Sequence, residues 1–171
     1  MKTYIALFRG VNVGGRTIKM ADLRETLGAL GLENAETILQ SGNVRFDSDL
    51  SGEKLQAMIE KELGTRFRYE AHLQVIERSK LEQVIDDYPF GAAGADSHDY
   101  VVFMERGLEK DLAAEEVELA KGERVTAGDG VVYWRVDKGS TLQSAFGRLL
   151  TKAKYRDFNT NRNLRTLRKL L

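Results

Sequence analysis

The sequence predicts an α+β protein made of two similar ferredoxin-like (βαββα) subdomains from an internal duplication, plus a C-terminal helix. Three observations carry this prediction. Short apolar runs rich in β-formers alternate with stretches of helical spacing, the order β-α-β-β-α occurs twice, and the two halves share short matching segments.

The first half begins with a predicted strand over residues 3–9, followed by a glycine-rich loop over residues 10–17. Apolar residues then recur at helical spacing from Met20 to Leu30, and Gly31 supplies a stop signal. Two strand-like runs, residues 36–40 and 44–47, flank Ser41-Gly42-Asn43 and predict a hairpin.

A second helix is predicted from the apolar stripe Leu55, Met58, Ile59 and Leu63, with Ser51 as its N-cap and Gly64 at its end. Residues 72–77 alternate as a fourth strand. The first half therefore has the order β-α-β-β-α-β.

The connection between the halves is a short helix from Ser79 to Tyr88, closed by Pro89, and a linker over residues 91–97. We therefore expect three parts: a first subdomain over residues 1–78, a connecting helix and linker over residues 79–97, and a second subdomain over residues 98–171.

The second half repeats the order of elements. Strands are predicted over residues 100–104, 123–126 and 131–136, and a helix over residues 108–120. A further helix starts at a capping box of Ser140 and Gln143, and its core face is Leu142, Ala145, Phe146, Leu149 and Leu150.

The two halves also match in sequence. The segment from Tyr4 to Gly10 resembles the segment from Tyr100 to Gly107 with one insertion, and Gly42-Asn43 and Gly128-Asp129 occupy the matching hairpins. Both matches favour a divergent duplication.

Composition excludes several classes of protein. With 171 residues, 42% apolar and 30% charged, the chain is long enough to bury a core and is typical of a globular protein. No apolar run reaches the length of a membrane span, and the absence of cysteine excludes disulfides and thiol catalysis. The apolar run at residues 4–8 is too short for a signal peptide, so we expect a cytoplasmic protein with no membrane partner.

The net charge of zero conceals an uneven distribution. Residues 1–24 carry +4, residues 25–147 carry −11 and residues 148–171 carry +7. Such asymmetry is typical of proteins with an anionic or nucleic-acid partner. It is equally consistent with a basic tail that packs on the acidic middle of its own chain, which is the simpler interpretation.

Topology points to a candidate site. In the ferredoxin-like strand order 4-1-3-2, the end of the first strand and the turn between the second and third strands lie at the same edge of the sheet. The polar, glycine-rich segments at residues 10–19 and 40–43 should converge there. The candidate ligand-binding residues at this edge are Arg9, Asn12, Gly14, Gly15, Arg16, Lys19, Ser41 and Asn43.

Residues 10–17 match the spacing of a phosphate-binding loop, G-x-x-x-x-G-K-T, except that Arg16 replaces lysine. The helix starts too late, and a guanidinium is wider than an ammonium, so a nucleotidase is not expected. A less specific hypothesis is that the loop binds an anion without hydrolysing it, through glycine N–H groups together with Arg9, Arg16 and Lys19. A tight strand-to-helix connection explains the same glycines without any ligand.

The C-terminal segment predicts an amphipathic helix, with an apolar stripe of Leu164, Leu167, Leu170 and Leu171 and Thr160 or Asn161 as its N-cap. Its basic residues, Arg162, Arg165, Arg168 and Lys169, form either a surface for phosphates or the solvated side of a docking helix.

Three segments of the chain resemble a large bacterial family of unknown function, the domain-of-unknown-function family numbered 1697. They are residues 9–15 (RGVNVGG), residues 18–23 (IKMADL) and residues 40–44 (QSGNV). Residues 160–170 are similar to the closing helix of that family, where an aromatic residue usually stands in place of Leu164. The resemblance implies a cytoplasmic bacterial protein of two similar α+β subdomains, and it brings no activity, cofactor or catalytic residue. Asn161, Arg162 and Asn163, near the start of this C-terminal segment, are further candidate ligand-binding residues.

The functional hypothesis is the binding of an anionic ligand, which is a nucleotide, a phosphorylated metabolite or a nucleic acid. One alternative is a small-molecule enzyme in which Asn12, Ser41 or Asn43 polarises a substrate. Another is a homo-oligomeric protein-interaction module. His72 and His98 have no recognisable carboxylate pattern beside them, so no metal site is predicted, and no cofactor is indicated.

Overall fold

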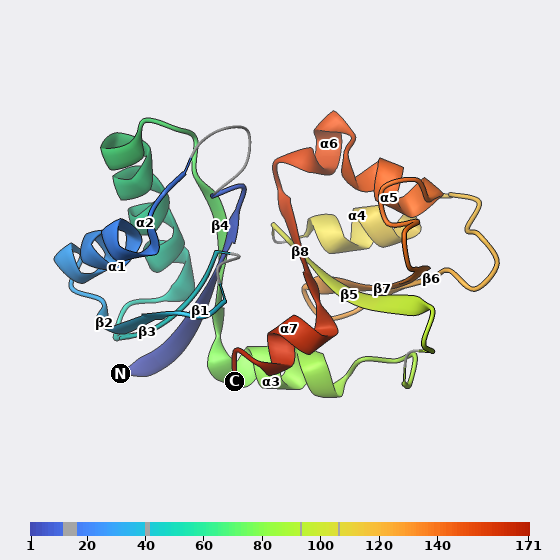
Figure 1. Cartoon of the computed structure of the whole chain (residues 1–171), viewed down its shortest axis with the longest axis horizontal. Coiled ribbons are helices and arrows are strands. Elements are labelled where there is room, and N and C mark those ends of the chain that lie inside the picture. The colour runs from blue at the N-terminus through green and yellow to red at the C-terminus, as the bar shows by residue number, and fades with distance from the viewer. Residues whose placement is uncertain (12–16, 40–41, 93, 106) are drawn as a thin grey trace. The chain divides into compact units, whose positions relative to one another are not determined.

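The computed structural model describes residues 1–11, 17–39, 42–92, 94–105 and 107–171. The chain forms two compact units, one of Met1–Leu81 with Lys169–Leu171 and the other of Glu82–Arg168. Each unit contains a four-stranded antiparallel sheet with helices packed on it (Figure 1). The predicted α+β class with two similar ferredoxin-like halves is confirmed.

The first unit has the expected element order. Its elements are β1 (Lys2–Arg9), α1 (Met20–Ala29), β2 (Glu33–Thr37), β3 (Asn43–Ser48), α2 (Gly52–Phe67) and β4 (His72–Glu77). The strand order is β2-β3-β1-β4, which is the predicted order 4-1-3-2. Helices α1 and α2 cover one face of this sheet (Figure 1).

Strand β1 lies inside the sheet, and this position explains its sequence. All five residues from Tyr4 to Phe8 are at most 3% exposed. Alternate residues of the run belong to the core that also contains Leu23 of α1 and Ile59 of α2, and the residues between them are buried as well. A strand buried on both faces is continuously apolar rather than alternating, as this run is.

The second unit repeats the same topology. Its elements are β5 (Ser97–Met104), α4 (Leu108–Ala114), β6 (Arg124–Ala127), β7 (Val131–Asp137), α5 (Ala145–Leu150), α6 (Ala153–Arg156), β8 (Asn159–Asn163) and α7 (Leu164–Arg168). Helix α3 (Arg78–Asp86) contains the boundary between the units in the chain. The strand order β6-β7-β5-β8 matches that of the first sheet, so β5 takes the place of β1 and β8 that of β4.

The prediction for the start of the C-terminal helix is wrong, because strand β8 occupies that position. The sequence pattern predicts that residues 160–163 open the C-terminal helix, with Thr160 or Asn161 as the N-cap, but they pair antiparallel with β5. The helix begins at Leu164, where the Asn163 side chain accepts a hydrogen bond from the backbone N–H of Arg165 at 2.9 Å. The segment has no apolar alternation, so only its pairing with β5 makes it a strand.

Two predicted helices have different bounds. Helix α4 ends at Ala114 rather than near residue 120, because Val117 and Leu119 pack on the core in a non-helical segment. Helix α2 continues past Gly64 to Phe67, because Phe67 and Tyr69 also pack on the core of the first unit.

The capping box predicted at Ser140 and Gln143 does not start a helix. Helix α5 begins at Ala145, and Ser144 is its N-cap, with the Ser144 hydroxyl accepting from the backbone N–H of Gly147. Leu142, which the sequence pattern assigns to the core, is 77% exposed. The turn over residues 140–144 therefore precedes the helix and leaves Leu142 outside it.

A substitution at Gly147 tests the packing of residues 140–144 against α5. A Cβ atom at Gly147 would lie 1.8 Å from the carbonyl oxygen of Thr141, so Gly147→Ala should lower the free energy of unfolding by about 3 kcal/mol or more. Gly28→Ala, within α1 and with no atom within 4 Å of the new Cβ, should instead raise it by about 0.5–1 kcal/mol. Urea unfolding followed by circular dichroism measures both. Equal stabilities for the two variants would contradict the packing of residues 140–144 on α5.

Candidate functional site

The end of β1 and the turn between β2 and β3 meet at one edge of the first sheet. Leu7 lies opposite Asn43, and the backbone N–H of Phe8 donates to the carbonyl oxygen of Gly42 at 2.8 Å. A Cβ at Gly42 would lie 3.2 Å from Cβ of Phe8 and 3.5 Å from Cγ2 of Val11. The turn therefore contacts both the end of β1 and the first residues of the following loop, as the topology predicted.

Gly42 is suited to this contact for two reasons. Its φ of +73° lies in the left-handed region that favours glycine, and its missing side chain allows the turn to approach β1 closely.

Asn43 closes the same turn. Its carbonyl oxygen accepts from the N–H of Ile38 at 2.9 Å, and its side-chain amide donates back to the carbonyl oxygen of Ile38 at 3.3 Å. The Asn43 side chain is fully buried, whereas Leu39 in the same turn is 45% exposed. Asn43 thus holds the shape of the turn.

Two of the predicted cationic residues of this edge, Arg9 and Lys19, belong to the described residues. Arg9 ends β1 opposite His72 of β4 and is half-buried. Lys19 is exposed and occupies the N-cap position of α1, where its side chain makes no capping hydrogen bond. The other predicted residues of this edge, Asn12, Gly14, Gly15, Arg16 and Ser41, lie outside the described residues.

The fold does not support a phosphate-loop nucleotidase. The strand that precedes residues 10–17 belongs to a wholly antiparallel sheet, and α1 starts only at Met20. Ile18, between the two, is 3% exposed and packs in the core of the unit. Residues 10–17 therefore share the spacing of the phosphate-loop motif but not its setting between a parallel strand and the start of a helix.

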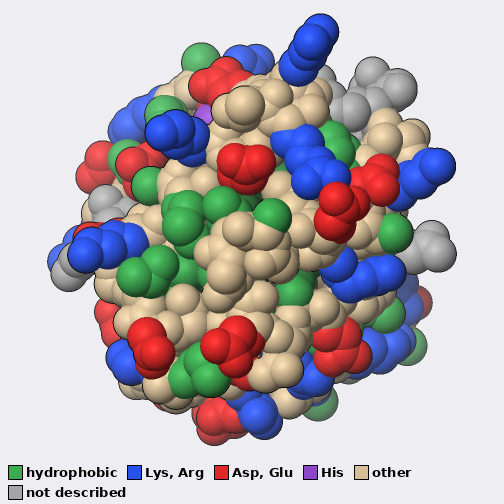
Figure 2. All heavy atoms as spheres, turned by 90° about the vertical axis from the view of Figure 1, so that its left-hand side faces the viewer, with side chains coloured by type: hydrophobic (Ala, Val, Ile, Leu, Met, Phe, Trp, Pro, Cys, Tyr) green, Lys and Arg blue, Asp and Glu red, His purple; other side chains and the backbone are tan. Residues whose placement is uncertain are grey.

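Charges of both signs alternate on the face of the molecule drawn in Figure 2. Lys and Arg side chains are intermingled there with Asp and Glu, without a broad region of one sign. In the first unit, for example, Arg66 of α2 pairs with Glu25 of α1 at 3.1 Å. This face is therefore not a broad basic surface of the kind that coats nucleic acid.

The C-terminal candidates Asn161, Arg162 and Asn163 lie on β8. Nη1 of Arg162 donates to Oγ1 of Thr160 at 2.7 Å and to the carbonyl oxygen of Asn161 at 2.8 Å. Burial lowers the pKa of Arg162 to about 10, so the guanidinium is still charged at neutral pH. Asn163 caps α7, as described above.

Part of the basic tail pairs with the acidic middle of the chain, in line with the simpler interpretation of the charge pattern. Nζ of Lys154 lies 3.5 Å from Glu115 and 3.9 Å from Asp111. The hydroxyl of Tyr155 donates to Oε1 of Glu115 at 2.6 Å, and this bond lowers the pKa of the Glu115 carboxyl.

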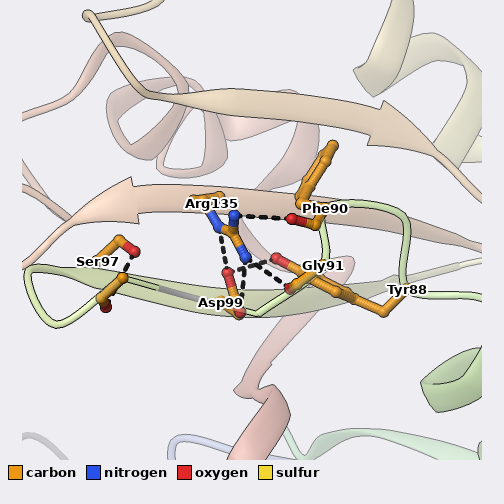
Figure 3. Close-up of polar contacts among 7 residues, drawn as sticks. Tyr88, Phe90, Gly91, Ser97, Asp99 and Arg135 are labelled. Atoms are coloured by element: carbon orange, nitrogen blue, oxygen red, sulfur yellow. Dashed lines mark hydrogen bonds and ion pairs between the residues drawn. The ribbon is translucent and has the colours of Figure 1, made fainter.

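A buried ion pair in the second unit was missed by the sequence prediction (Figure 3). Nε and Nη2 of Arg135 on β7 donate to the two carboxylate oxygens of Asp99 on β5, at 2.7 and 3.1 Å. The hydroxyl of Tyr88 donates to the same carboxylate at 2.7 Å. Asp99 and Arg135 lie directly opposite each other in the register of β5 and β7. The sequence shows the two opposite charges, but it does not show the strand register that pairs them.

The same arginine holds the segment that follows α3. Its Nη1 donates to the carbonyl oxygen of Phe90 and its Nη2 to that of Gly91, both at 2.9 Å. Burial, followed by the hydrogen bond to Asp99, raises the pKa of Tyr88 far above its ordinary value. The cluster is a hydrogen-bonded clamp between the sheet and residues 88–91, and its polar groups face one another (Figure 3).

In the part of the chain that the structure describes, no three His, Cys, Asp or Glu side chains are grouped so that they could hold a metal ion. No helix among the same residues has the length and apolar character needed to cross a membrane.

The clamp yields a prediction on stability. Arg135→Met leaves the buried Asp99 carboxylate without its cation and should cost about 3–5 kcal/mol of unfolding free energy. Replacing both partners, Asp99→Leu with Arg135→Met, should restore part of this loss, because no uncompensated charge remains. Arg124→Met, at the exposed partner position on β6, serves as the control and should change stability by about 0.5 kcal/mol or less. Urea unfolding measures all three variants, and a double variant less stable than Arg135→Met alone would contradict a coupled pair.

A second prediction concerns alkaline pH. Burial raises the pKa of Tyr133 from 10.0 to about 12, and its hydroxyl donates to the carbonyl oxygen of Val84. Because the folded pKa exceeds the unfolded one, the contribution of Tyr133 to stability is complete below pH 10 and is lost as the pH rises toward about 12. Urea unfolding between these pH values should show a steeper decline for the unmodified protein than for Tyr133→Phe. Identical slopes would contradict the assignment.

Known proteins share this architecture. The conserved bacterial protein SP0830 from Streptococcus pneumoniae matches the structure with a TM-score of 0.82 and 27% sequence identity, over 99% of this chain and 96% of that one. The sequence has no match among curated proteins. The family model described as protein of unknown function (DUF1697) matches residues 1–133. The chain, with its two antiparallel sheets of the same strand order, belongs to the DUF1697 family.

Proposed function

We propose that the protein binds an anionic, phosphate-bearing ligand at the edge of the first unit formed by residues 9–19 and 40–43. The contact of Gly42 with Phe8 and Val11 carries the proposal, because it brings the turn before β3 against the end of β1 and the start of the loop that follows. Loops held on a rigid sheet edge are common places for binding residues.

The charge of this surface favours an anion over a cation. Residues 1–24 carry +4, and Arg9 and Lys19 stand at the two ends of the loop that follows β1. Lys19 also stands at the start of the ten-residue helix α1 and makes no side-chain cap there. Backbone N–H groups at the start of a helix and lysine ammonium groups both attract phosphate.

Strand β8 supplies a second set of candidate residues, Asn161, Arg162 and Asn163, which is tested separately. The lowered pKa of Arg162 means that the folded protein disfavours its charged form, so this cation costs stability. The planar guanidinium group can in general contact phosphate oxygens in a bidentate manner.

The test is binding at low ionic strength to ATP, inorganic phosphate and a single-stranded oligonucleotide, measured by isothermal titration calorimetry. Lys19→Ala and Arg16→Ala should each weaken binding by about tenfold, because each removes one charge-assisted contact. Lys61→Ala removes the same charge from an exposed position on α2 and should leave the affinity unchanged. Arg162→Gln reports on β8 independently of the first-unit edge.

The ligand class follows from the salt dependence. A nucleic acid should lose affinity steeply between 50 and 200 mM salt, by about 10³-fold for six or more phosphate contacts, whereas a small phosphate compound should lose far less. If the Lys19 and Arg16 variants bind every ligand like the unmodified protein, the edge of the first unit is not the site.

A further inference from the structure

The second unit contains a cavity that shares no residue with the candidate edge of the first unit. Its volume is about 170 Å³, and it lies between the turn before β6, the end of β7 and the segment that precedes α5. It is lined by Ala120, Lys121, Glu123, Val136, Asp137, Ser140, Gln143 and Ser144. Since a water molecule occupies about 30 Å³ in the liquid, this volume suits a ligand of about five heavy atoms.

Glu123 is the buried charged group in this lining, with 7% of its surface exposed. Its Oε1 accepts from Nε1 of Trp134 at 3.0 Å, and its Oε2 accepts from the backbone N–H of Ala120 at 3.1 Å. Both donors are neutral. A carboxylate has about four acceptor sites, so these two bonds leave acceptor capacity on the group.

The charges around the cavity are not compensated within the described part of the chain. Among those residues, neither Glu123 nor Asp137 forms an ion pair with a Lys, Arg or His side chain, and Lys121 forms none with an acid. The Asp137 carboxylate lies beside the turn at Gly122, where a Cβ would be 3.9 Å from Oδ1. Two carboxylates against one lysine give the lining an excess of negative charge.

The hydroxyl and amide groups of Ser140 and Gln143 add neutral hydrogen-bonding partners to the wall. The turn that carries them is held by its own backbone, since the N–H groups of Gln143 and Ser144 both donate to the carbonyl oxygen of Ser140. The wall is therefore preformed, and a ligand would not have to order it.

The geometry points to this cavity as a binding site for a small primary amine. The ammonium group contacts the buried Glu123 carboxylate, Asp137 adds a second negative charge at the rim, and Ser140 or Gln143 bonds a hydroxyl or other polar end of the ligand. Charge-assisted hydrogen bonds to a desolvated carboxylate are the strongest polar contacts that a cavity of this size offers.

Trp134 provides a built-in reporter for the test. It is the only tryptophan of the chain, and its indole N–H donates to Glu123, so its fluorescence and its single indole N–H signal in NMR respond to changes at that carboxylate. The probe is ethanolamine, titrated into the full chain at constant ionic strength. Ethylene glycol is the uncharged comparison, and tetramethylammonium is a cation that cannot donate a hydrogen bond.

We expect a saturable change with ethanolamine in the millimolar range and none with ethylene glycol or tetramethylammonium. Glu123→Gln keeps an acceptor for Trp134 but removes the charge, and it should weaken binding by about tenfold or more. Glu116→Gln makes the same chemical change at an exposed position outside the cavity and should bind like the unmodified protein.

Two results would overturn the proposal. One is the absence of any ethanolamine-dependent signal from Trp134 in the unmodified protein. The other is a folded Glu123→Gln variant, checked by circular dichroism, that binds as tightly as the original. If Glu123→Gln fails to fold, Asp137→Asn at the exposed rim takes its place, and unchanged affinity in that variant overturns the proposal in the same way.

Discussion

Each sheet of this protein contains an apolar strand that pairs along both of its edges and is buried on both of its faces. Strand β1 pairs with β3 and β4, and β5 pairs with β7 and β8. The runs Tyr4–Phe8 of β1 and Val101–Met104 of β5 are buried throughout, and a strand buried on both faces is continuously apolar. Two neighbours pair directly with each of these strands, and the outer strands β2 and β6 are added through β3 and β7.

The candidate binding edge is a direct result of that arrangement. Because β3 lies beside β1 and runs antiparallel to it, the turn before β3 must come to the end of β1. Gly42 permits the close approach, and Asn43 fixes the turn with its buried amide. The close approach and the hydrogen bonds between Asn43 and Ile38 therefore hold the described part of this turn against the end of β1.

The neutral total charge conceals three different local situations. Asp99 and Arg135 compensate each other inside the second unit, and Lys154 is matched by acids near the surface. Around Glu123, by contrast, the described side chains leave negative charge in excess. The difference matters because a buried carboxylate held only by neutral donors attracts a cation much more strongly than an exposed one does.

The order of elements in the first half, and in the second half as far as α5, could be predicted from the sequence. The interior position of residues 3–9 and the convergence at Gly42 could be predicted too, since apolar periodicity and strand order depend on local pattern and chain connectivity.

For the candidate site, the residue types were visible in the sequence but their roles were not. Asn43 and Asn163 were candidates for ligand binding, and the structure places their side chains in hydrogen bonds that hold a turn and cap a helix. Sequence by itself thus determined the topology of the first unit and the edge where its loops meet. Only the tertiary structure decided that the polar segment 159–163 is a strand, that Asp99 faces Arg135 and that Glu123 is buried beside Trp134, because all three depend on contacts between residues far apart in the chain.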